Sequence, residues 1–307
     1  MGGMDPRKDT PELPATALRD IAVVVAGAAA RHIALRRNEL GHDGVSATAA
    51  TKSSDVDPVT VVDRESEQLI RRLLSNLAPG SEILGEEEGR GSASVAGRKS
   101  PITWIVDPID GTVNFLYGIP AYAVSIACAV DSEIVAGVVV NVATGETYSA
   151  AAGKGATLTF PDGRRETLGC GSALSLGQAL IATGFSYSSD LRRVQGEVAA
   201  YLLPRCRDIR RMGSAALDLC AVARGAVDAY YEHGIKIWDW AAGALIAKEA
   251  GAQLKTPVLA GALNAKGIGD GDALENGVFA CEIGIAETFL DTCEQAIDRA
   301  RSVSTGS

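Results

Sequence analysis

The sequence predicts a protein of mixed α+β / α/β class, built from two β-sheets with helices packed on their faces. Helical spacing of apolar residues early in the chain, followed by a dense run of strands up to about residue 150, predicts two helices packed on an antiparallel sheet. After about residue 155, short apolar strands alternate with helical stretches, which predicts a second sheet covered by helices.

The first half, residues 16–155, is expected to begin with two amphipathic helices. Apolar residues recur at helical spacing over 16–40 and again over 63–77, where Pro79-Gly80 ends the pattern. Segments 51–63 and 89–100 lack this spacing and are predicted to be loops. The strands expected here are 82–89, 102–106, 121–130, 133–140 and 145–150.

The second half, residues 156–301, is expected to alternate strands with helices. The strands are predicted at 179–183, 227–231 and 278–281, and the helices at 189–203, 214–224, 240–250 and 285–300. No repeat or long linker separates the halves, so they are predicted to form one rigid body. Residues 1–15 and 302–307 are expected to be flexible tails.

Composition excludes several classes of function. At 307 residues and 47% hydrophobic content the chain can bury a large core, which excludes a disordered protein. The net charge of −9 disfavours direct binding to nucleic acid or to an anionic membrane. Six cysteines without a CxxC pair and three scattered histidines indicate buried free thiols and no zinc site. With no recognisable signal peptide or spanning segment, a cytoplasmic location is expected.

The stretch "WIVDPIDGTVNF" (104–115) places two carboxylates, Asp107 and Asp110, where an apolar strand ends. Three further acids stand at element ends or in loops: Asp63, Glu87 and Asp239. Carboxylates without histidine or cysteine suit Mg²⁺ or Mn²⁺ rather than zinc. A helix that begins after Gly111 would also offer free N–H groups to a phosphate.

Each feature also has an ordinary structural interpretation. A DxxD at a strand end is more often a capped turn, and a lone aspartate before a helix, such as Asp239, is more often an N-cap. The run "GEEEG" (85–89) alone is usually solvated surface. The residue pattern by itself therefore leaves a metal–phosphate site and these structural roles both open.

The order and spacing of several motifs resemble the inositol monophosphatase family over about residues 16–295. The motifs are "KSSDVDPVTVVD", "GEEEG", "WIVDPIDGTVNF", "MGSAALDLC", "DAYYE" and "WDWAAGALIAKEAGA". The chain looks most similar to the bacterial SuhB-type members. The resemblance implies a layered αβαβα sandwich, a homodimer, Mg²⁺ dependence with two or three ions, and inhibition by lithium.

Carried over by position, the resemblance also implies a role for each site residue. Glu87, Asp107, Asp110, Asp239 and the carbonyl of Ile109 would hold the metal ions. Thr112, backed by Asp63, would orient the attacking water, while the N–H groups of Gly111 and Thr112 bind phosphate. Ala215 and Glu232 would contact the substrate's hydroxyls, and Lys52 would lie in a mobile loop. Three departures, Pro58, Glu88 and Lys236, leave the metal set intact but bear on substrate preference.

The activity that this resemblance implies is hydrolysis of inositol monophosphate by metal-activated water. Fructose 1,6-bisphosphate and histidinol phosphate remain alternative substrates for the same chemistry. A regulatory protein that binds the transcription machinery is the alternative of another class, although the clustered acids favour catalysis.

Overall fold

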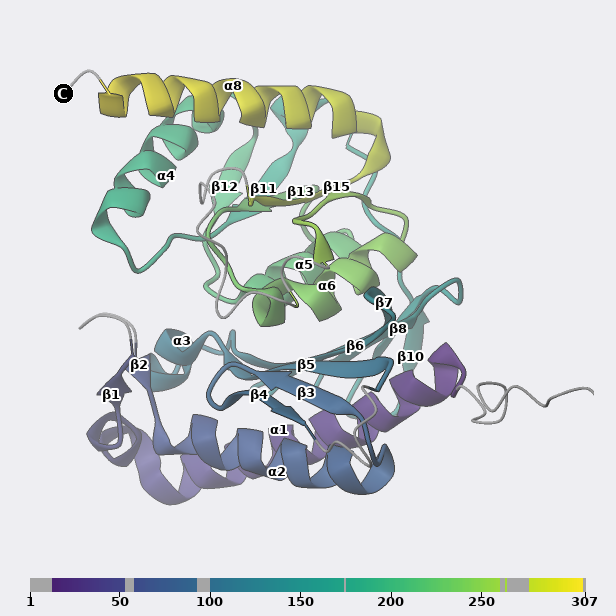
Figure 1. Ribbon diagram of the computed structural model, residues 1–307. Coiled ribbons are helices and arrows are strands. Elements are labelled where there is room, and N and C mark those ends of the chain that lie inside the picture. The colour runs from purple at the N-terminus through teal and green to yellow at the C-terminus, as the bar shows by residue number, and fades with distance from the viewer. Residues whose placement is uncertain are drawn as a thin grey trace, which may run out of the picture.

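The molecule is layered in the order helices, sheet, helices, sheet, helices, so the predicted αβαβα arrangement is confirmed (Figure 1). This computed structural model describes residues 13–52, 58–92, 100–173, 175–259, 263 and 276–305. Most of the tail expected at 1–15 lies outside the described residues, and the first helix begins at Ala15.

The first layer consists of α1 (Ala15–Ala47) and α2 (Val61–Leu77). Leu18, Val25 and Ile33 of α1 are fully buried against α2 and the sheet beneath it. The helix predicted over 16–40 therefore continues to Ala47, with a kink at Gly41. No helix in the described ranges has the length and apolarity that a bilayer crossing requires.

The first sheet has eight strands in the order β10-β9-β8-β7-β6-β5-β3-β4. Their bounds are β3 Glu82–Gly85, β4 Gly89–Ser92, β5 Ile102–Asp110, β6 Ala123–Val130, β7 Glu133–Asn141, β8 Thr147–Ala151, β9 Ala156–Thr159 and β10 Arg165–Thr167. Neighbours pair antiparallel, as predicted, except for the parallel pair β3–β5. The sheet runs on to residue 167, beyond the division expected at 155/156.

Two predicted loops contain short strands. The loop predicted over 51–63 overlaps β1 (Ala50–Thr51), which pairs with β2 (Pro58–Val59), and its last residues already belong to α2. Residues 53–57 lie outside the described residues. Within 89–100 the structure has β4, because this segment pairs back onto β3, and residues 93–99 lie outside the described residues.

The middle layer consists of α5 (Ala215–Ala223) and α6 (Ile237–Glu249). Both are apolar nearly all round, as expected for helices that pack against a sheet on either side. Trp240 of α6 shares one core with Ile105 of the first sheet and Tyr230 of the second. This layer packs against both sheets.

The second sheet has the order β12-β11-β13-β15-β14. The strands are β11 Leu180–Thr183, β12 Asp208–Arg210, β13 Ala229–Glu232, β14 Gln253–Lys255 and β15 Val278–Cys281. β11 pairs parallel with both β12 and β13, whereas β15 is antiparallel to its neighbours. The loops that follow β11 and β13 therefore lie at the same end of the sheet, beyond the carboxyl ends of these two strands.

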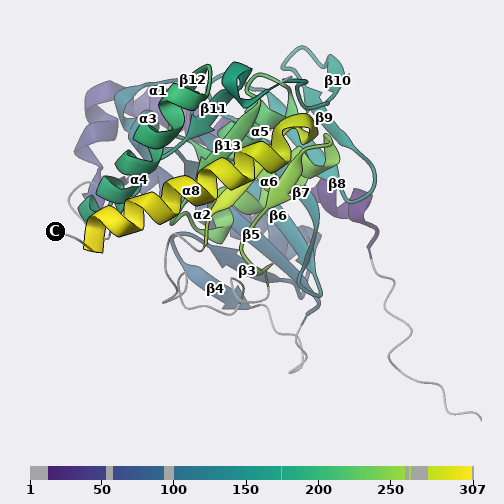
Figure 2. The ribbon, with the colours of Figure 1, turned by 90° about the horizontal axis from the view of Figure 1, so that it is seen from above.

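The outer layer is formed by α4 (Ser189–Leu202) and α8 (Ala286–Thr305), which lie side by side across the second sheet (Figure 2). Val198 and Phe289 are fully buried where these helices meet the sheet. Residues 302–305, expected in a flexible tail, form the last turn of α8. Short 3-10 turns span Leu176–Gln178, Leu203–Arg205 and Ile283–Ile285, and the one-and-a-half-turn α3 (Thr112–Tyr117) follows β5.

Candidate active site

A bulge in β5 turns Asp107 and Asp110 toward the same side of the sheet. Side chains three positions apart on a regular strand point to opposite faces. Here Asp107 pairs with Ser125 and Asp110 with Ala123, so β5 has one residue more than β6 between these pairs. Such an extra residue re-aims the side chains that follow it. Pro108 stands within the bulge, where its missing N–H does not break the ladder.

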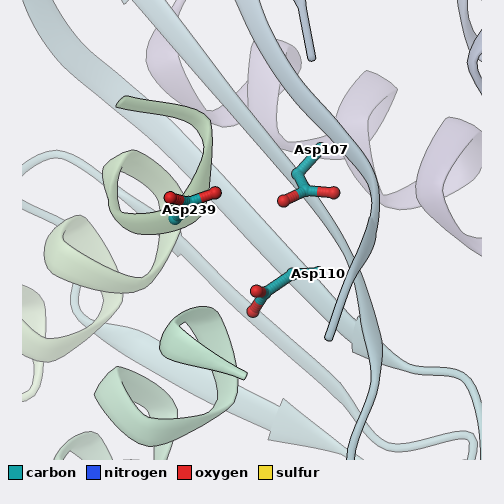
Figure 3. A group of neighbouring side chains, drawn as sticks. All are labelled: Asp107, Asp110 and Asp239. Atoms are coloured by element: carbon teal, nitrogen blue, oxygen red, sulfur yellow. The ribbon is translucent and has the colours of Figure 1, made fainter. Parts of the chain in front are cut away.

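Asp239, in the first turn of α6, completes an acidic cluster with these two residues (Figure 3). One carboxylate oxygen from each aspartate lies within 4.8 Å of the others. Backbone N–H groups orient two of the carboxylates, since Ile109 donates to Asp107 at 3.0 Å and Lys236 donates to Asp239 at 2.5 Å.

Asp110 is fixed from α5. Its Oδ2 accepts hydrogen bonds from Ser214 Oγ at 2.5 Å and from the Ala216 N–H at 2.8 Å. Ser214 is also the N-cap of α5, because its hydroxyl accepts from the Leu217 N–H. The start of a buried helix therefore sets the position of one carboxylate of the cluster.

The structure brings Glu86, rather than the predicted Glu87, to the cavity beside Asp107. β3 pairs parallel with β5 so that Gly85 faces Val106, and the Glu86 N–H donates to the Val106 carbonyl at 3.2 Å. Glu86 lines the cavity. Its charge is the second largest cause of the raised pKa of Asp107, after burial. Glu87 is outside the cavity lining, and buried Glu67 of α2 accepts its N–H at 2.7 Å. The register between the strands decides which acid of the run faces the cluster.

Lys52, predicted in a mobile loop, reaches both of these glutamates. Its Nζ lies 2.7 Å from Glu86 Oε1 and 2.5 Å from Glu87 Oε1. Burial lowers the pKa of Lys52, but the two carboxylates outweigh burial and the net shift is upward. The lysine therefore stays charged and offsets part of the negative charge at this end of the cavity.

Thr112 and Asp63 are in contact, although 49 positions separate them in the chain. Thr112 Oγ1 lies 3.1 Å from Asp63 Oδ1 and 3.0 Å from the Ile109 carbonyl. The other oxygen of Asp63 accepts from the Thr60 N–H and hydroxyl, within the capping box that begins α2. Burial raises the pKa of Asp63 to about 6, although the hydrogen bonds from Thr60 favour the ionised form and oppose this shift.

Gly111 allows the sharp turn from β5 into α3. Its φ of 90° lies in the left-handed region, and a Cβ there would approach the carbonyl of Ala121 at 2.9 Å and that of Gly213 at 3.0 Å. Asn114 Nδ2 holds the same two segments by donating to the carbonyls of Ala121 and Met212 at 2.7 Å.

The acidic cluster opens into a cavity of about 440 Å³ that residues from both halves of the chain line. The predicted residues that line it are Lys52, Asp107, Ile109, Asp110, Gly111, Thr112, Ala215, Glu232 and Asp239. Glu232 ends β13, and Tyr230 Oη donates to its Oε2 at 2.9 Å. Lys236, one of the departures noted above, lines the same cavity, as does Arg211, which the sequence analysis did not identify.

Burial and mutual repulsion make the ionised cluster costly. Burial, and then the charges of Glu86, Asp110 and Asp239, raise the pKa of Asp107 well above its usual range. Burial raises the pKa of Asp110 to about 6, although the bonds from Ser214 and Ala216 oppose it. Burial also raises the pKa of Glu232 to about 7. A bound cation would relieve this repulsion.

Comparison with known proteins decides the family. The model of the inositol monophosphatase family matches residues 17–276. The chain belongs to the inositol monophosphatase family. It is accordingly a phosphatase, and its acidic cluster is a group of residues that could hold a metal ion.

Similar proteins and solved structures support the same family assignment. The chain is 52% identical over 252 residues to an inositol-1-monophosphatase SuhB of Mycobacterium tuberculosis, covering 80% of this chain and 86% of that protein. A solved structure of M. tuberculosis SuhB superposes with a TM-score of 0.75 at 43% identity, covering 93% and 98% of the two chains. A relative from Pasteurella multocida, named Nus factor SuhB, is 40% identical over 66% of this chain and 72% of its own length.

Proposed function

We propose that this inositol monophosphatase family member is a Mg²⁺-dependent phosphomonoesterase that hydrolyses inositol monophosphate. One observation carries the proposal: an acidic cluster, a threonine–aspartate pair and a separate carboxylate, Glu232, line or adjoin one cavity of about 440 Å³. The cluster suits metal and phosphate, and Glu232 suits the hydroxyls of the alcohol.

The residues present fit a hard divalent cation. We propose that Glu86, Asp107, Asp110, Asp239 and the Ile109 carbonyl hold two or three Mg²⁺ ions, with Mn²⁺ as a substitute. The set offers oxygen donors only, and the carboxylates are too crowded to be ionised together without a cation. Bound there, the metal would lower the pKa of a water molecule and offset negative charge on the phosphoryl oxygens.

The chain's own groups would orient the water and the ester. When the Thr112 hydroxyl donates to Asp63, its lone pairs can accept a hydrogen bond from a water molecule. Asp63 is ionised above its pKa of about 6 and can take up the proton that the threonine relays. The N–H groups of Gly111 and Thr112 would hold the phosphate, and Ala215 and Glu232 the alcohol.

A phosphate-release screen over inositol, sugar and amino-alcohol phosphates tests the proposal. We expect turnover of inositol monophosphate with Mg²⁺, none in excess EDTA, and inhibition by millimolar lithium. Turnover that continues in EDTA contradicts the metal assignment, and indifference to inositol monophosphate contradicts the substrate.

Arg211 and Lys236 favour one second candidate, a substrate with two anionic groups. Both line the cavity, and among the described residues neither lies within ion-pair distance of a carboxylate. A second phosphate, as in fructose 1,6-bisphosphate, could pair with them. Lys236→Gln should then lower kcat/KM for bisphosphates while inositol monophosphate is spared. Adding histidinol phosphate to the same phosphate-release screen tests the other alternative substrate.

Assembly and partners remain proposals. We propose a homodimer, which gel filtration should show near twice 31.7 kDa. The cytoplasmic location stays a prediction.

The relative named Nus factor SuhB favours testing for a protein partner as well. Capture of a transcription protein by an inactive Asp110→Asn variant would support that role.

A further inference from the structure

Two cavity-lining loops leave the same edge of the second sheet. Residues 184–188 follow β11 and residues 233–236 follow β13, and these strands are adjacent and parallel. Ligand sites commonly form beyond the carboxyl ends of such strands. Gly184, Ser186 and His233 are among the residues of these loops that line the cavity.

A single buried side chain on α4 joins the two loops. Gln195 is 2% exposed. Its Oε1 accepts from the Ser186 N–H at 2.7 Å, and its Nε2 donates to the His233 carbonyl at 3.0 Å. The amide of a glutamine offers one donor group and one acceptor atom side by side without carrying a charge. Because α4 packs against both this sheet and α8, the bridge ties both loops to the outer layer.

Glu232 lies between the loops that Gln195 joins. It directly precedes His233, and its carboxylate lies against Gly184, where a Cβ on residue 184 would overlap it. The spacing of the two loops therefore determines where the Glu232 carboxylate points. The acidic cluster lies on β5 and α6, and among the described residues it shares no hydrogen bond with Gln195.

We propose that Gln195 is a positioning residue for the alcohol half of the substrate. It holds the 184–188 and 233–236 loops at the spacing that places Glu232 against the substrate's hydroxyls. The inference rests on the phosphomonoesterase function proposed above, and it assigns substrate selectivity in part to a side chain that does not line the cavity.

Gln195→Leu removes both hydrogen bonds and keeps a side chain of similar size. We expect kcat/KM for inositol monophosphate to fall about 5–30-fold, mainly through KM, the scale of one or two buried hydrogen bonds. With p-nitrophenyl phosphate, whose leaving group offers no hydroxyl, the change should stay within about twofold. Gln295→Leu, an exposed glutamine on α8 that accepts from Tyr201, is the matched control and should alter neither substrate.

A double-mutant cycle with Glu232→Ala separates positioning from a general structural role. If Gln195 acts through Glu232, Gln195→Leu should cost little further activity once Glu232 is alanine. Additive losses, or equal losses on both substrates with wild-type Glu232, overturn the proposal. So does an unchanged kcat/KM for inositol monophosphate in Gln195→Leu.

Hydrogen exchange gives a readout that does not need the proposed substrate. The Ser186 amide should exchange faster in Gln195→Leu but stay protected in Gln195→Glu, which keeps the acceptor oxygen. Unchanged protection in Gln195→Leu overturns the bridge itself. If the wild-type protein does not hydrolyse inositol monophosphate, the proposed function fails, and the exchange result still decides whether Gln195 holds the loops.

Discussion

At the scale of single residues, Asp107 is expected to contribute more to catalysis than to the stability of the metal-free protein. Its carboxylate is buried beside Glu86, Asp110 and Asp239, and these charges raise its pKa together with burial. Asp107→Asn keeps the shape and removes the charge. We expect kcat to fall at least about 100-fold, beyond the usual loss from changes around a metal's ligands.

The same substitution should raise the melting temperature in EDTA, because it removes like-charge repulsion from a buried site. Asp190→Asn on α4, where the side chain is 88% exposed, is the control for both measurements. A lower melting temperature for Asp107→Asn in EDTA would show that the carboxylate stabilises the metal-free fold.

Thr112 is expected to act through its hydroxyl rather than as the start of α3. Thr112→Ala should slow the chemical step about 10²–10⁴-fold, the scale of positioned proton transfer. Thr112→Ser keeps an oxygen 3.1 Å from Asp63 and should recover most of that loss. Single-turnover kinetics with Mg²⁺ in excess measure the step, and equal rates for the alanine and serine variants would leave the hydroxyl without a role.

At the scale of elements, strand register selects Glu86. Its position beyond the Gly85–Val106 pair brings it beside Asp107, whereas Glu87 lies outside the cavity lining. Glu86→Gln should therefore raise the Mg²⁺ concentration for half-maximal activity at least about tenfold. Glu87→Gln, the matched neighbour, should shift it less. Titrating the activity of both variants with Mg²⁺ measures these shifts. A larger shift for Glu87→Gln than for Glu86→Gln would identify Glu87 as the metal ligand.

Local sequence patterns were enough to predict the main helices, most strands and the carboxylates at the exit of β5. The bulge itself was not predicted, although Pro108 was an available signal for it, since proline inside a strand commonly marks one. What the sequence could not provide was pairing between distant segments. The choice of Glu86 depends on how β3 aligns with β5, and the role of Gln195 depends on two loops nearly fifty residues apart meeting at one edge. Such pairings are set by tertiary packing, which local propensity does not encode.

At the scale of the whole molecule, the site makes metal-free stability depend on pH in an unusual direction. Burial raises the pKa of Asp63 and of Asp110 from 3.8 to about 6, and that of Glu232 from 4.5 to about 7. Between about pH 4 and 7 the folded protein then binds more protons than the unfolded chain. Since stability rises with pH only where the unfolded state binds more protons, the free energy of unfolding should fall as pH rises through this window.

In EDTA we therefore expect a melting temperature a few degrees lower at pH 7.5 than at pH 5. Under the proposed metal assignment Mg²⁺ would bind the ionised carboxylates, so saturating Mg²⁺ should raise the melting temperature most at pH 7.5 and weaken or reverse the trend. The overall charge of −9 also disfavours the folded state as pH rises, and Asp107→Asn separates the two causes because it alters the cluster and leaves the surface unchanged. A smaller pH dependence in this variant assigns the effect to the cluster. A melting temperature that rises from pH 5 to 7.5 in EDTA would mean that the carboxylates are stabilised as anions without metal, and that the cation is not needed to offset their repulsion.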